Sequence, residues 1–341
     1  MREEKDEFKL TTVTYGTSSA PFLAKKALAQ IGADCEDDMI RNIIINDFYM
    51  DDRMTGADSV EECKQIQEKV SVQLEKFRFP LRKWMSNNST ILETIPNDGN
   101  IEVVPINDDE TVKTLGLQWH PNKDVFMFKI KSDQYERVTK RIALSTLARI
   151  FDPIGWLAPF TTCVKLFIQR LWMMKTGWDD QLDDDLQKEW DVIMKSLPSL
   201  QGLTIPRWYK TTKSSKVELH GFADASQKAY AAVVYIKVGS VISLVAAKSK
   251  VDPVKNRKTL PKLELCATHL LAKLVERILS TMQRQIEVNT WCDSTMTLSW
   301  INNIKRERKI MLWRLGLMLP GRMFKYEHGL EYIYKLVISM S

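Results

Sequence analysis

The feature that most restricts the fold is the order of segments between residues 217 and 303. A strand, VELHGFADAS, ends in small and acidic residues, and AYAAVVYIK and VISLVAAKS follow on either side of residues 238–240. That spacing predicts a β-hairpin. An amphipathic helix from about Leu263 to Met282, a strand EVNTWCDS and a short helix complete the region. The order β-β-β-α-β-α predicts a mixed sheet with helices packed on it.

Three carboxylates stand at the ends of these segments. Asp224 closes the first strand, Glu264 opens the helix and Asp293 closes the fourth strand. Ligand sites in α/β sheets gather near strand ends and the adjoining helix termini. If the first and fourth strands pair in parallel, Asp224 and Asp293 lie side by side, and Glu264 can point toward them. Three clustered carboxylates repel one another unless a hard cation lies among them.

Mg²⁺, or Mn²⁺, is therefore the predicted cofactor. Two such ions about 4 Å apart can activate a water molecule and stabilise the leaving oxygen of a phosphodiester. The alternative is that each acid merely caps a helix or lies in a turn. Asp293 suits that alternative, because Ser294 and Thr295 follow it before a helix. Glu264, which stands between two leucines, suits it less well.

A second acidic site is predicted at Asp51 and Asp52, directly after Phe48, Tyr49 and Met50. The surrounding stretch, IRNIIINDFYMDDRMTGADS, predicts a β-hairpin with an acidic turn. Adjacent aspartates are common in turns. The aromatic lead-in, however, presents both carboxylates from a rigid strand end. Polymerases use such a hairpin to hold the metals that bind an incoming nucleotide's phosphates.

Two further helical regions are predicted, one after the acidic hairpin and one further along the chain. Ser59 and Glu62 form an S-x-x-E capping box, and apolar residues follow it at helical spacing. Residues 138–175 also follow a helical pattern, interrupted by FDPIGWLAP. Pro153 and Gly155 in this interruption predict a bend between two helices.

Bulk composition adds weaker constraints. The net charge of +6, from 49 basic and 43 acidic residues, is compatible with nucleic-acid binding and equally with a mixed solvated surface. No window approaches the roughly 18 uninterrupted apolar residues of a membrane span. We expect an intracellular protein, cytoplasmic by default with the nucleus as the alternative, without a membrane partner. Scattered cysteines and histidines predict neither a disulfide framework nor a structural zinc site, and no motif predicts a small-molecule cofactor.

Over about residues 9–303 the chain resembles the Pol polyprotein of BEL/Pao-type long-terminal-repeat retrotransposons. FYMDD is similar to the reverse-transcriptase catalytic box, and VTYGTSSAPFLA to the motif that opens a palm helix. FRFPLRKWMSN and KTLGLQW are similar to later palm motifs and the primer grip. TKRIALSTLARIFDPIGWLAPF resembles the Pao connection region. GFADAS, LPKLELCA and WCDST resemble the ribonuclease H part.

The resemblance implies a multidomain fold of the α+β and α/β classes. Residues 1–135 would form a partial reverse-transcriptase palm and the start of the thumb, and residues 136–212 the helical connection. Residues 213–303 would form a ribonuclease H-like mixed β-sheet flanked by helices. Residues 304–341 form a tail that departs from the family sequence.

For the palm, the resemblance implies that Asp51 and Asp52 are metal ligands and that Tyr49 and Met50 contact nucleic acid. The family carries a further catalytic aspartate upstream of the GTSSAPF stretch, where this chain has only Asp6, in a hydrophilic context. The fingers domain is also missing. We therefore expect no DNA polymerisation by this chain alone, and templated nucleotide incorporation by the purified protein would refute that expectation.

For the ribonuclease H part, the resemblance implies that Asp224, Glu264 and Asp293 are the first three acids of a site that cuts RNA in RNA–DNA hybrids. Such a hybrid is recognised through its shape, phosphates and 2′-hydroxyls. The expected partners are an RNA–DNA hybrid or other nucleic acid and the remaining Pol segments. The predicted contacts with the nucleic-acid backbone are Lys248, Lys250 and Lys262.

Two other interpretations stay open. No aspartate follows Asp293, and the only later acids are Glu307, Glu327 and Glu331, so a fourth ribonuclease H acid is not evident. The chain could accordingly be a catalytically inactive, nucleic-acid-binding or structural relic of a mobile element. An aspartic peptidase is less well supported, because such enzymes use D-T/S-G turns and neither GFADAS nor WCDST supplies the glycine.

Overall fold

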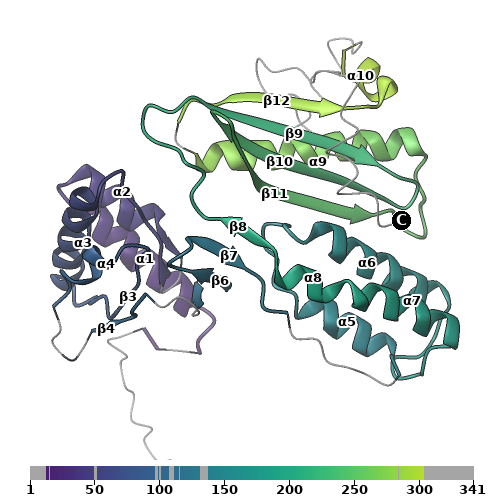
Figure 1. The fold of residues 1–341 in the computed structure, drawn as a ribbon, viewed down its shortest axis with the longest axis horizontal. Helices are drawn as coiled ribbons and strands as arrows, with labels where there is room; N and C mark the ends of the chain where they lie inside the picture. The colour runs from purple at the N-terminus through teal and green to yellow at the C-terminus, as the bar shows by residue number, and fades with distance from the viewer. Residues whose placement is uncertain are drawn as a thin grey trace, which may run out of the picture. The chain divides into compact units, whose positions relative to one another are not determined.

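The protein was studied as a computed structural model, and it divides into an N-terminal unit, Met1–Asp124, and a C-terminal unit, Val125–Ser341 (Figure 1). Each unit is described by itself. The structure describes residues 13–14, 16–49, 52–96, 99, 101–106, 111–114, 116–130, 137–282 and 284–302. None of the helices in these ranges is long and apolar enough to cross a membrane.

The N-terminal unit combines helices with short strands. Its helices are α1 (Ala20–Ala33), α2 (Asp38–Asn46), α3 (Val60–Glu75) and α4 (Ser89–Leu92). Its strands are β1 (Phe48–Tyr49), β2 (Asp52–Arg53), β3 (Lys83–Trp84), β4 (Glu102–Val103), β5 (Val112–Thr114) and β6 (Leu117–His120). β1 and β2 pair antiparallel, β3 and β4 pair parallel, and β5 and β6 pair antiparallel.

The core of this unit lies between α1, α2 and α3. The capping box predicted for α3 is confirmed, because Ser59 Oγ accepts a hydrogen bond of 3.1 Å from the Glu62 amide. In return, the Glu62 carboxylate accepts one of 3.3 Å from the Asp58 amide. Most of the core side chains recur at steps of three or four, so each helix buries one stripe. They are Leu28, Ile31, Cys35, Ile40, Ile43, Ile44, Ile66, Val70 and Leu74.

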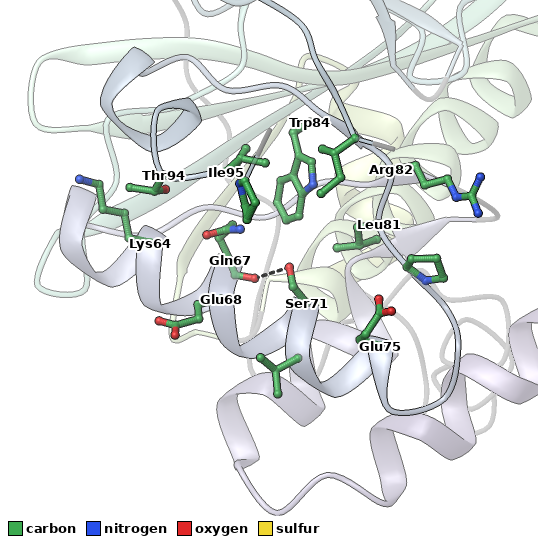
Figure 2. Close-up of a pocket in the computed structure, with 14 residues that line it drawn as sticks. Lys64, Gln67, Glu68, Ser71, Glu75, Leu81, Arg82, Trp84, Thr94 and Ile95 are labelled. Atoms are coloured by element: carbon green, nitrogen blue, oxygen red, sulfur yellow. Dashed lines mark hydrogen bonds between the residues drawn. The ribbon is translucent and has the colours of Figure 1, made fainter. Parts of the chain in front are cut away.

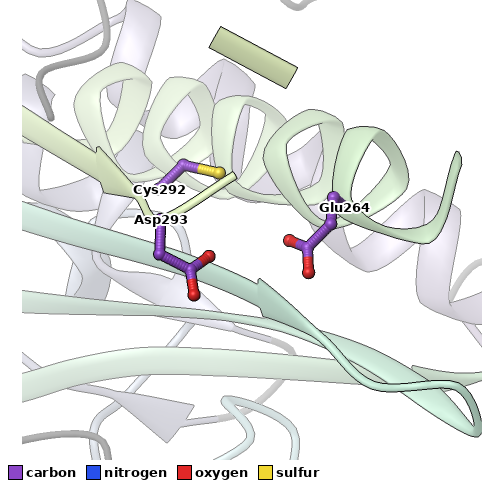
Figure 3. A group of neighbouring side chains, drawn as sticks. All are labelled: Glu264, Cys292 and Asp293. Carbon is purple, nitrogen blue, oxygen red and sulfur yellow. The ribbon is translucent and has the colours of Figure 1, made fainter. Parts of the chain in front are cut away.

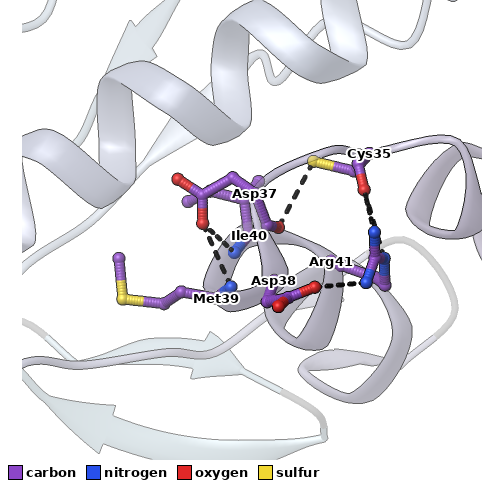
Figure 4. A network of polar contacts seen from close by, with 6 residues as sticks. All are labelled: Cys35, Asp37, Asp38, Met39, Ile40 and Arg41. Atoms are coloured by element: carbon purple, nitrogen blue, oxygen red, sulfur yellow. Dashed lines mark hydrogen bonds and ion pairs between the residues drawn. The ribbon is translucent and has the colours of Figure 1, made fainter.

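One sequence prediction in this unit was wrong. The apolar run before the acidic turn forms helix α2 and not the first strand of a long hairpin. Asp37 caps this helix, since its Oδ1 accepts hydrogen bonds from the amides of Met39, at 3.0 Å, and Ile40, at 3.2 Å (Figure 4). The cap and the buried isoleucine stripe outweigh the β-preference of the branched side chains. The hairpin is therefore limited to β1 and β2.

The C-terminal unit contains a helical part and a larger sheet. The helical part holds β7 (Val125–Met127), α5 (Lys140–Ala148), α6 (Ala158–Met173), α7 (Asp184–Lys195), α8 (Leu197–Gln201) and β8 (Thr204–Pro206), with β7 and β8 antiparallel. The sheet part holds β9 (Val217–Ala225), β10 (Ala229–Val238), β11 (Val241–Val251), α9 (Leu260–Thr281), β12 (Glu287–Cys292) and α10 (Thr295–Asn302). This β-β-β-α-β-α order confirms the prediction.

The strand order of the larger sheet is β11-β10-β9-β12 (Figure 1). β10 pairs antiparallel with both β9 and β11, and Gly239 takes a φ of +60° in the predicted hairpin turn. β12 pairs in parallel with β9, as predicted. The first and fourth strands consequently end at the same edge of the sheet.

Helix α9 packs closely on one face of this sheet. A Cβ on Gly221 of β9 would lie 2.7 Å from Leu271 Cδ1 of the helix, so only glycine allows this approach without a shift. Alternate residues of β9, Leu219 and Ala223 among them, face the same apolar core as Ala267 and Val275 of α9. This packing fixes the start of α9 near the ends of β9 and β12.

The segment between α5 and α6 binds the outer strand β11. The Ala247 amide donates a hydrogen bond of 3.0 Å to the Ile154 carbonyl, and Trp156 Nε1 donates one of 3.0 Å to the Val245 carbonyl. Gly155 has a φ of +84°, and a Cβ there would lie 1.8 Å from the Ala247 carbonyl oxygen. The helical part and the sheet are thus joined by these two hydrogen bonds. The close approach of the two backbones at Gly155 leaves no room for a Cβ.

Asp152 holds this segment in shape. Its Oδ1 accepts hydrogen bonds from the amides of Gly155, at 3.0 Å, and Trp156, at 2.8 Å, and its Oδ2 accepts one of 2.8 Å from Leu157. Burial raises the pKa of this carboxyl, and the three amides oppose that rise. The predicted bend between two helices is confirmed, and Asp152 is the residue that stabilises it.

Candidate metal centre

The sheet register brings two of the predicted acids together. In the parallel pair of β9 and β12, Ala223 lies opposite Cys292, so the next residues, Asp224 and Asp293, are neighbours across the strand ends. The Asp224 carboxylate accepts a hydrogen bond of 2.7 Å from the Ala225 amide. Asp293 is exposed to solvent. The predicted side-by-side placement of these aspartates is confirmed.

Glu264 approaches the two aspartates from the start of α9. Its side chain points toward the strand end that carries Cys292 and Asp293 (Figure 3). Glu264 is 8% exposed, and its Oε2 atom is buried without a hydrogen-bond partner. A buried charged oxygen without a partner is costly, because water has been removed and nothing has replaced it.

The pKa values of two of the clustered acids are also raised. Burial, and then the negative charge of Asp293, raises the pKa of Asp224 to about 6. Burial, and then the charges of Asp224 and Asp293, raises the pKa of Glu264 to about 8. A divalent cation between these oxygens would reverse both effects. The cluster therefore fits an oxygen-bound cation such as Mg²⁺.

The structure also separates Asp293 from a simple capping role. The residue that caps α10 is Ser294, whose Oγ accepts a hydrogen bond of 3.2 Å from the Thr297 amide. The Ser294 carbonyl accepts a further bond of 3.0 Å from the Leu298 amide. Ser294, and not Asp293, therefore caps α10.

Cys292 belongs to the cluster and was missed in the sequence. Its Sγ and one carboxylate oxygen each of Glu264 and Asp293 all lie within 4.8 Å of one another (Figure 3). Cys292 is 3% exposed, and burial raises the pKa of its thiol to about 11. The signal in the sequence was its position directly before Asp293, at the end of a strand whose alternate residues face α9.

Residues 139–294 match a family model described as a Pao retrotransposon-like RNaseH-like domain. The match confirms the resemblance drawn from the motifs. The matched residues begin at the N-cap of α5 and end two residues after β12. They therefore include helices of the helical part and all four strands of the larger sheet. No curated protein matches the sequence.

Solved structures show the same fold. The chain is similar to a foamy viral protease-reverse transcriptase in complex with double-stranded DNA, with a TM-score of 0.55 and 18% identity over 93% of this chain and 60% of that one. The same foamy viral protein in complex with an RNA/DNA hybrid gives 0.53 and 18%, over 94% and 39%. A dRH form gives 0.54 and 16%, over 91% and 49%. The chain thus spans between 39% and 60% of these proteins, and its mixed multidomain fold is confirmed.

The predicted lysines lie on the surface of the RNaseH-like domain. Lys248 and Lys250 are alternate residues of β11, and Lys262 lies in the first turn of α9; all three are exposed. Burial, opposed by Asp152, lowers the pKa of Lys165, and the charge of Lys248 lowers it further. A positive region therefore includes β11 and α6, and its contact with nucleic acid stays a prediction.

The N-terminal unit holds only part of the predicted palm site within the described residues. Tyr49 pairs with Asp52 across the hairpin, and both are exposed. Met50 and Asp51 lie outside the described residues. Behind the hairpin, the Arg53 guanidinium lies 5.6 Å from the centre of the Trp84 ring. Burial lowers the pKa of Arg53, against the opposing charge of Asp47. The hairpin is confirmed, and the metal-binding role of its aspartates stays a prediction.

A cavity of about 700 Å³ lies elsewhere in the N-terminal unit, between α3 and the chain that follows it (Figure 2). Side chains of both signs line it, among them Lys64, Glu68, Glu75 and Arg82, together with Trp84. Neither Tyr49 nor Asp52 is among its lining residues. The cavity is therefore separate from the predicted palm site.

Proposed function

We propose that the RNaseH-like domain hydrolyses the RNA strand of RNA–DNA hybrids, using Mg²⁺ or Mn²⁺ held by Asp224, Glu264 and Asp293. The observation that carries this proposal is the buried, partnerless oxygen of Glu264, which faces two further carboxylates at one sheet edge. A bound cation would offset the repulsion among these three carboxylates. The setting, a Pao retrotransposon-like RNaseH-like domain, agrees with that chemistry.

Each acid has a distinct task in this proposal. Asp224 and Asp293 present their carboxylates from fixed strand ends, and Glu264 supplies the buried oxygen from α9. Because the pKa of Glu264 is raised to about 8, this residue would release a proton to solvent when it binds a cation near neutral pH. Ions held by Asp224, Glu264 and Asp293 would activate a water molecule and stabilise the leaving oxygen of the phosphodiester.

Exposed lysines and the similar solved structures support a nucleic-acid duplex as the substrate. The similar foamy viral structures hold double-stranded DNA and an RNA/DNA hybrid. Lys262 lies two residues before Glu264, and Lys248 and Lys250 lie along β11, where exposed ammonium groups could contact phosphates. Such contacts position a duplex without reading its sequence. A hybrid fits this arrangement better than a small metabolite.

A second candidate is a protein that binds hybrids without cleaving them. It is favoured by one observation, the absence of any aspartate after Asp293 in the sequence. With three acids, the site could hold a cation and still lack the fourth carboxylate that the family places on a later helix. In this candidate, the metal centre would stabilise the fold and the lysines would bind nucleic acid.

Cleavage of a labelled RNA–DNA hybrid by the full chain, with Mg²⁺ or Mn²⁺, tests the first candidate. Asp224→Asn should reduce the rate at least about a hundredfold, comparable with the loss of one preorganised electrostatic group. Asp179→Asn is a matched control, because that exposed aspartate pairs only at the surface, with Arg141. Hybrid binding measured on the same samples separates the candidates. Binding without cleavage by folded wild-type protein would favour the second.

A further inference from the structure

We propose that this centre is also a site for thiophilic ions, in which Zn²⁺ or Cd²⁺ is bound by Glu264, Cys292 and Asp293. This trio is called the thiophilic site below. The inference rests on the metal-binding part of the proposed function and does not depend on RNA cleavage. It adds a sulfur donor to a centre that otherwise contains only carboxylates.

The spacing of the donor atoms suits one shared ion. The three atoms, one sulfur and two carboxylate oxygens, all lie within 4.8 Å of one another. Zinc–sulfur bonds of about 2.3 Å and zinc–oxygen bonds of about 2.0–2.2 Å place two donors at most about 4.5 Å apart. Small rotations of the side chains would therefore bring all three donors to an ion.

The burial of the site favours a bound ion over solvent. Cys292 faces α9, and the Thr268 hydroxyl lies 3.8 Å from its sulfur while donating a bond of 2.8 Å to the Glu264 carbonyl. Glu264 directs its partnerless Oε2 into the same space (Figure 3). That oxygen is an independent sign of a missing ligand, since hydrogen bonds satisfy nearly all buried polar atoms in folded proteins.

The chemistry of the donors decides which ions the thiophilic site selects. A thiolate is a soft ligand that favours zinc and similar ions, whereas Mg²⁺ prefers oxygen ligands and water. When Zn²⁺ or Cd²⁺ binds, the Cys292 thiol gives its proton to solvent and its sulfur lone pair to the ion. Mg²⁺ would use the carboxylates and leave the thiol protonated. Because Glu264 and Asp293 serve both ions, thiophilic ions and Mg²⁺ should exclude each other.

Cys292 could instead be a small side chain that merely fills the core beside α9. Free cysteines are often buried for that reason alone. Cys266 provides the comparison, because it lies on α9, is partly buried and is not part of the donor trio. A difference between the two cysteines in metal binding would therefore report on the position of Cys292 and not on thiols in general.

The test is a titration of the reduced, full-length chain with Cd²⁺, followed by the ultraviolet charge-transfer band of a cadmium–thiolate bond. We expect a band that saturates at one ion per chain, disappears in Cys292→Ser and persists in Cys266→Ser. Glu264→Gln should weaken Cd²⁺ binding at least about tenfold, because the loss of an outer-shell partner alone costs that much. Excess Mg²⁺ should raise the Cd²⁺ concentration required.

An equal band in the wild type and in Cys292→Ser, or no band in the wild type, would overturn the thiophilic site. If Cys292→Ser fails to fold, as judged by circular dichroism, the decision passes to Glu264→Gln, whose unchanged Cd²⁺ affinity would also overturn it. Hybrid cleavage with Mg²⁺ is measured on the same wild-type preparation. Cleavage without a cadmium band rejects the thiophilic site alone, and a band without cleavage rejects the nuclease alone.

Discussion

Both acidic sites of this chain were predicted from the sequence as metal sites, and they differ in structure. At the hairpin of the N-terminal unit, Asp52 lies on a strand of two residues and is exposed to solvent. At the candidate metal centre of the C-terminal unit, Asp224 and Asp293 follow two neighbouring strands, and Glu264 comes from a helix. There, burial and mutual repulsion raise the pKa values of Asp224 and Glu264.

The difference shows that acidic residues become a strained centre only when the fold forces them together. A carboxylate on the exposed surface keeps much of its contact with water. A carboxylate packed beside two others and deprived of water is destabilised until a cation arrives. The sheet of the C-terminal unit creates this difference, because the parallel pairing of β9 and β12 brings the acids together. The following changes test the comparison.

The first test removes the contact between the 154–156 segment and β11, and it should have the largest effect. Gly155→Ala should lower the free energy of unfolding of the C-terminal unit by roughly 2 to 5 kcal/mol, from a positive φ and a clash with the Ala247 carbonyl. Chemical denaturation would measure it. Gly202→Ala is the control, because a Cβ there comes no closer than 3.9 Å to another atom. Equal effects of both changes would contradict the role of the 154–156 segment.

The second test concerns the charge of the centre. The folded pKa of Glu264, about 8, lies above its ordinary value of 4.5, so the folded state binds the proton more tightly. Stability of the metal-free protein should therefore fall as pH rises from about 4.5 through about 8, and Mg²⁺ should restore it. Glu264→Gln should remove the part of this fall that Glu264 causes and leave the part that Asp224 causes below about pH 6. It should also stabilise the metal-free protein at pH above about 8 by on the order of 2 to 4 kcal/mol.

Thermal melts across this pH range, with and without Mg²⁺, measure the effect. Glu276→Gln, an exposed change on the same helix, should leave the pH profile as it is in the wild type. A Glu264→Gln variant that is less stable than the wild type at high pH would show that its carboxylate is satisfied in the folded protein.

The third test lies in the N-terminal unit and concerns the cap of α3. Ser59→Ala removes the hydrogen bond of 3.1 Å at the start of α3 and should cost that unit about 1 kcal/mol. Proteolysis of the α3 region under native conditions would detect the loss. A variant whose α3 region is cleaved no faster than that of the wild type would contradict the role of this cap.

The smallest effect is expected at the hairpin. Asp52→Asn should change the free energy of unfolding by less than about 0.5 kcal/mol, because an exposed surface carboxylate contributes little. Denaturation curves at pH 6 and pH 9 should coincide with those of the wild type within that margin. A stabilisation that appears only at high pH would place Asp52 in a strained cluster like that of Glu264.

Much of the C-terminal unit could be predicted from the sequence. Its β-β-β-α-β-α order follows from the sequence, and the meeting of Asp224 with Asp293 was expected on the condition that the first and fourth strands pair in parallel, which the structure meets. These features are local in the sequence or follow from general topology. They needed no knowledge of which side chains pack against each other.

The rest depended on contacts that the sequence does not display. The isoleucine-rich run before the hairpin forms α2, because the Asp37 cap and a buried stripe decide its conformation. Asp152 was not recognised as a cap, because its three acceptor bonds form only when the chain folds back at Gly155. Cys292 was read as one scattered cysteine among five, because its proximity to Glu264 arises from the packing of α9 on the sheet.

The contact between the 154–156 segment and β11 has a consequence for solubility. β11 is an outer strand of its sheet, and unpaired backbone groups on outer strands invite association with other chains. Ile154 and Trp156 occupy two of these groups, at Ala247 and Val245. A fragment cut between the helical part and the sheet would leave them open, and such fragments should aggregate through β11.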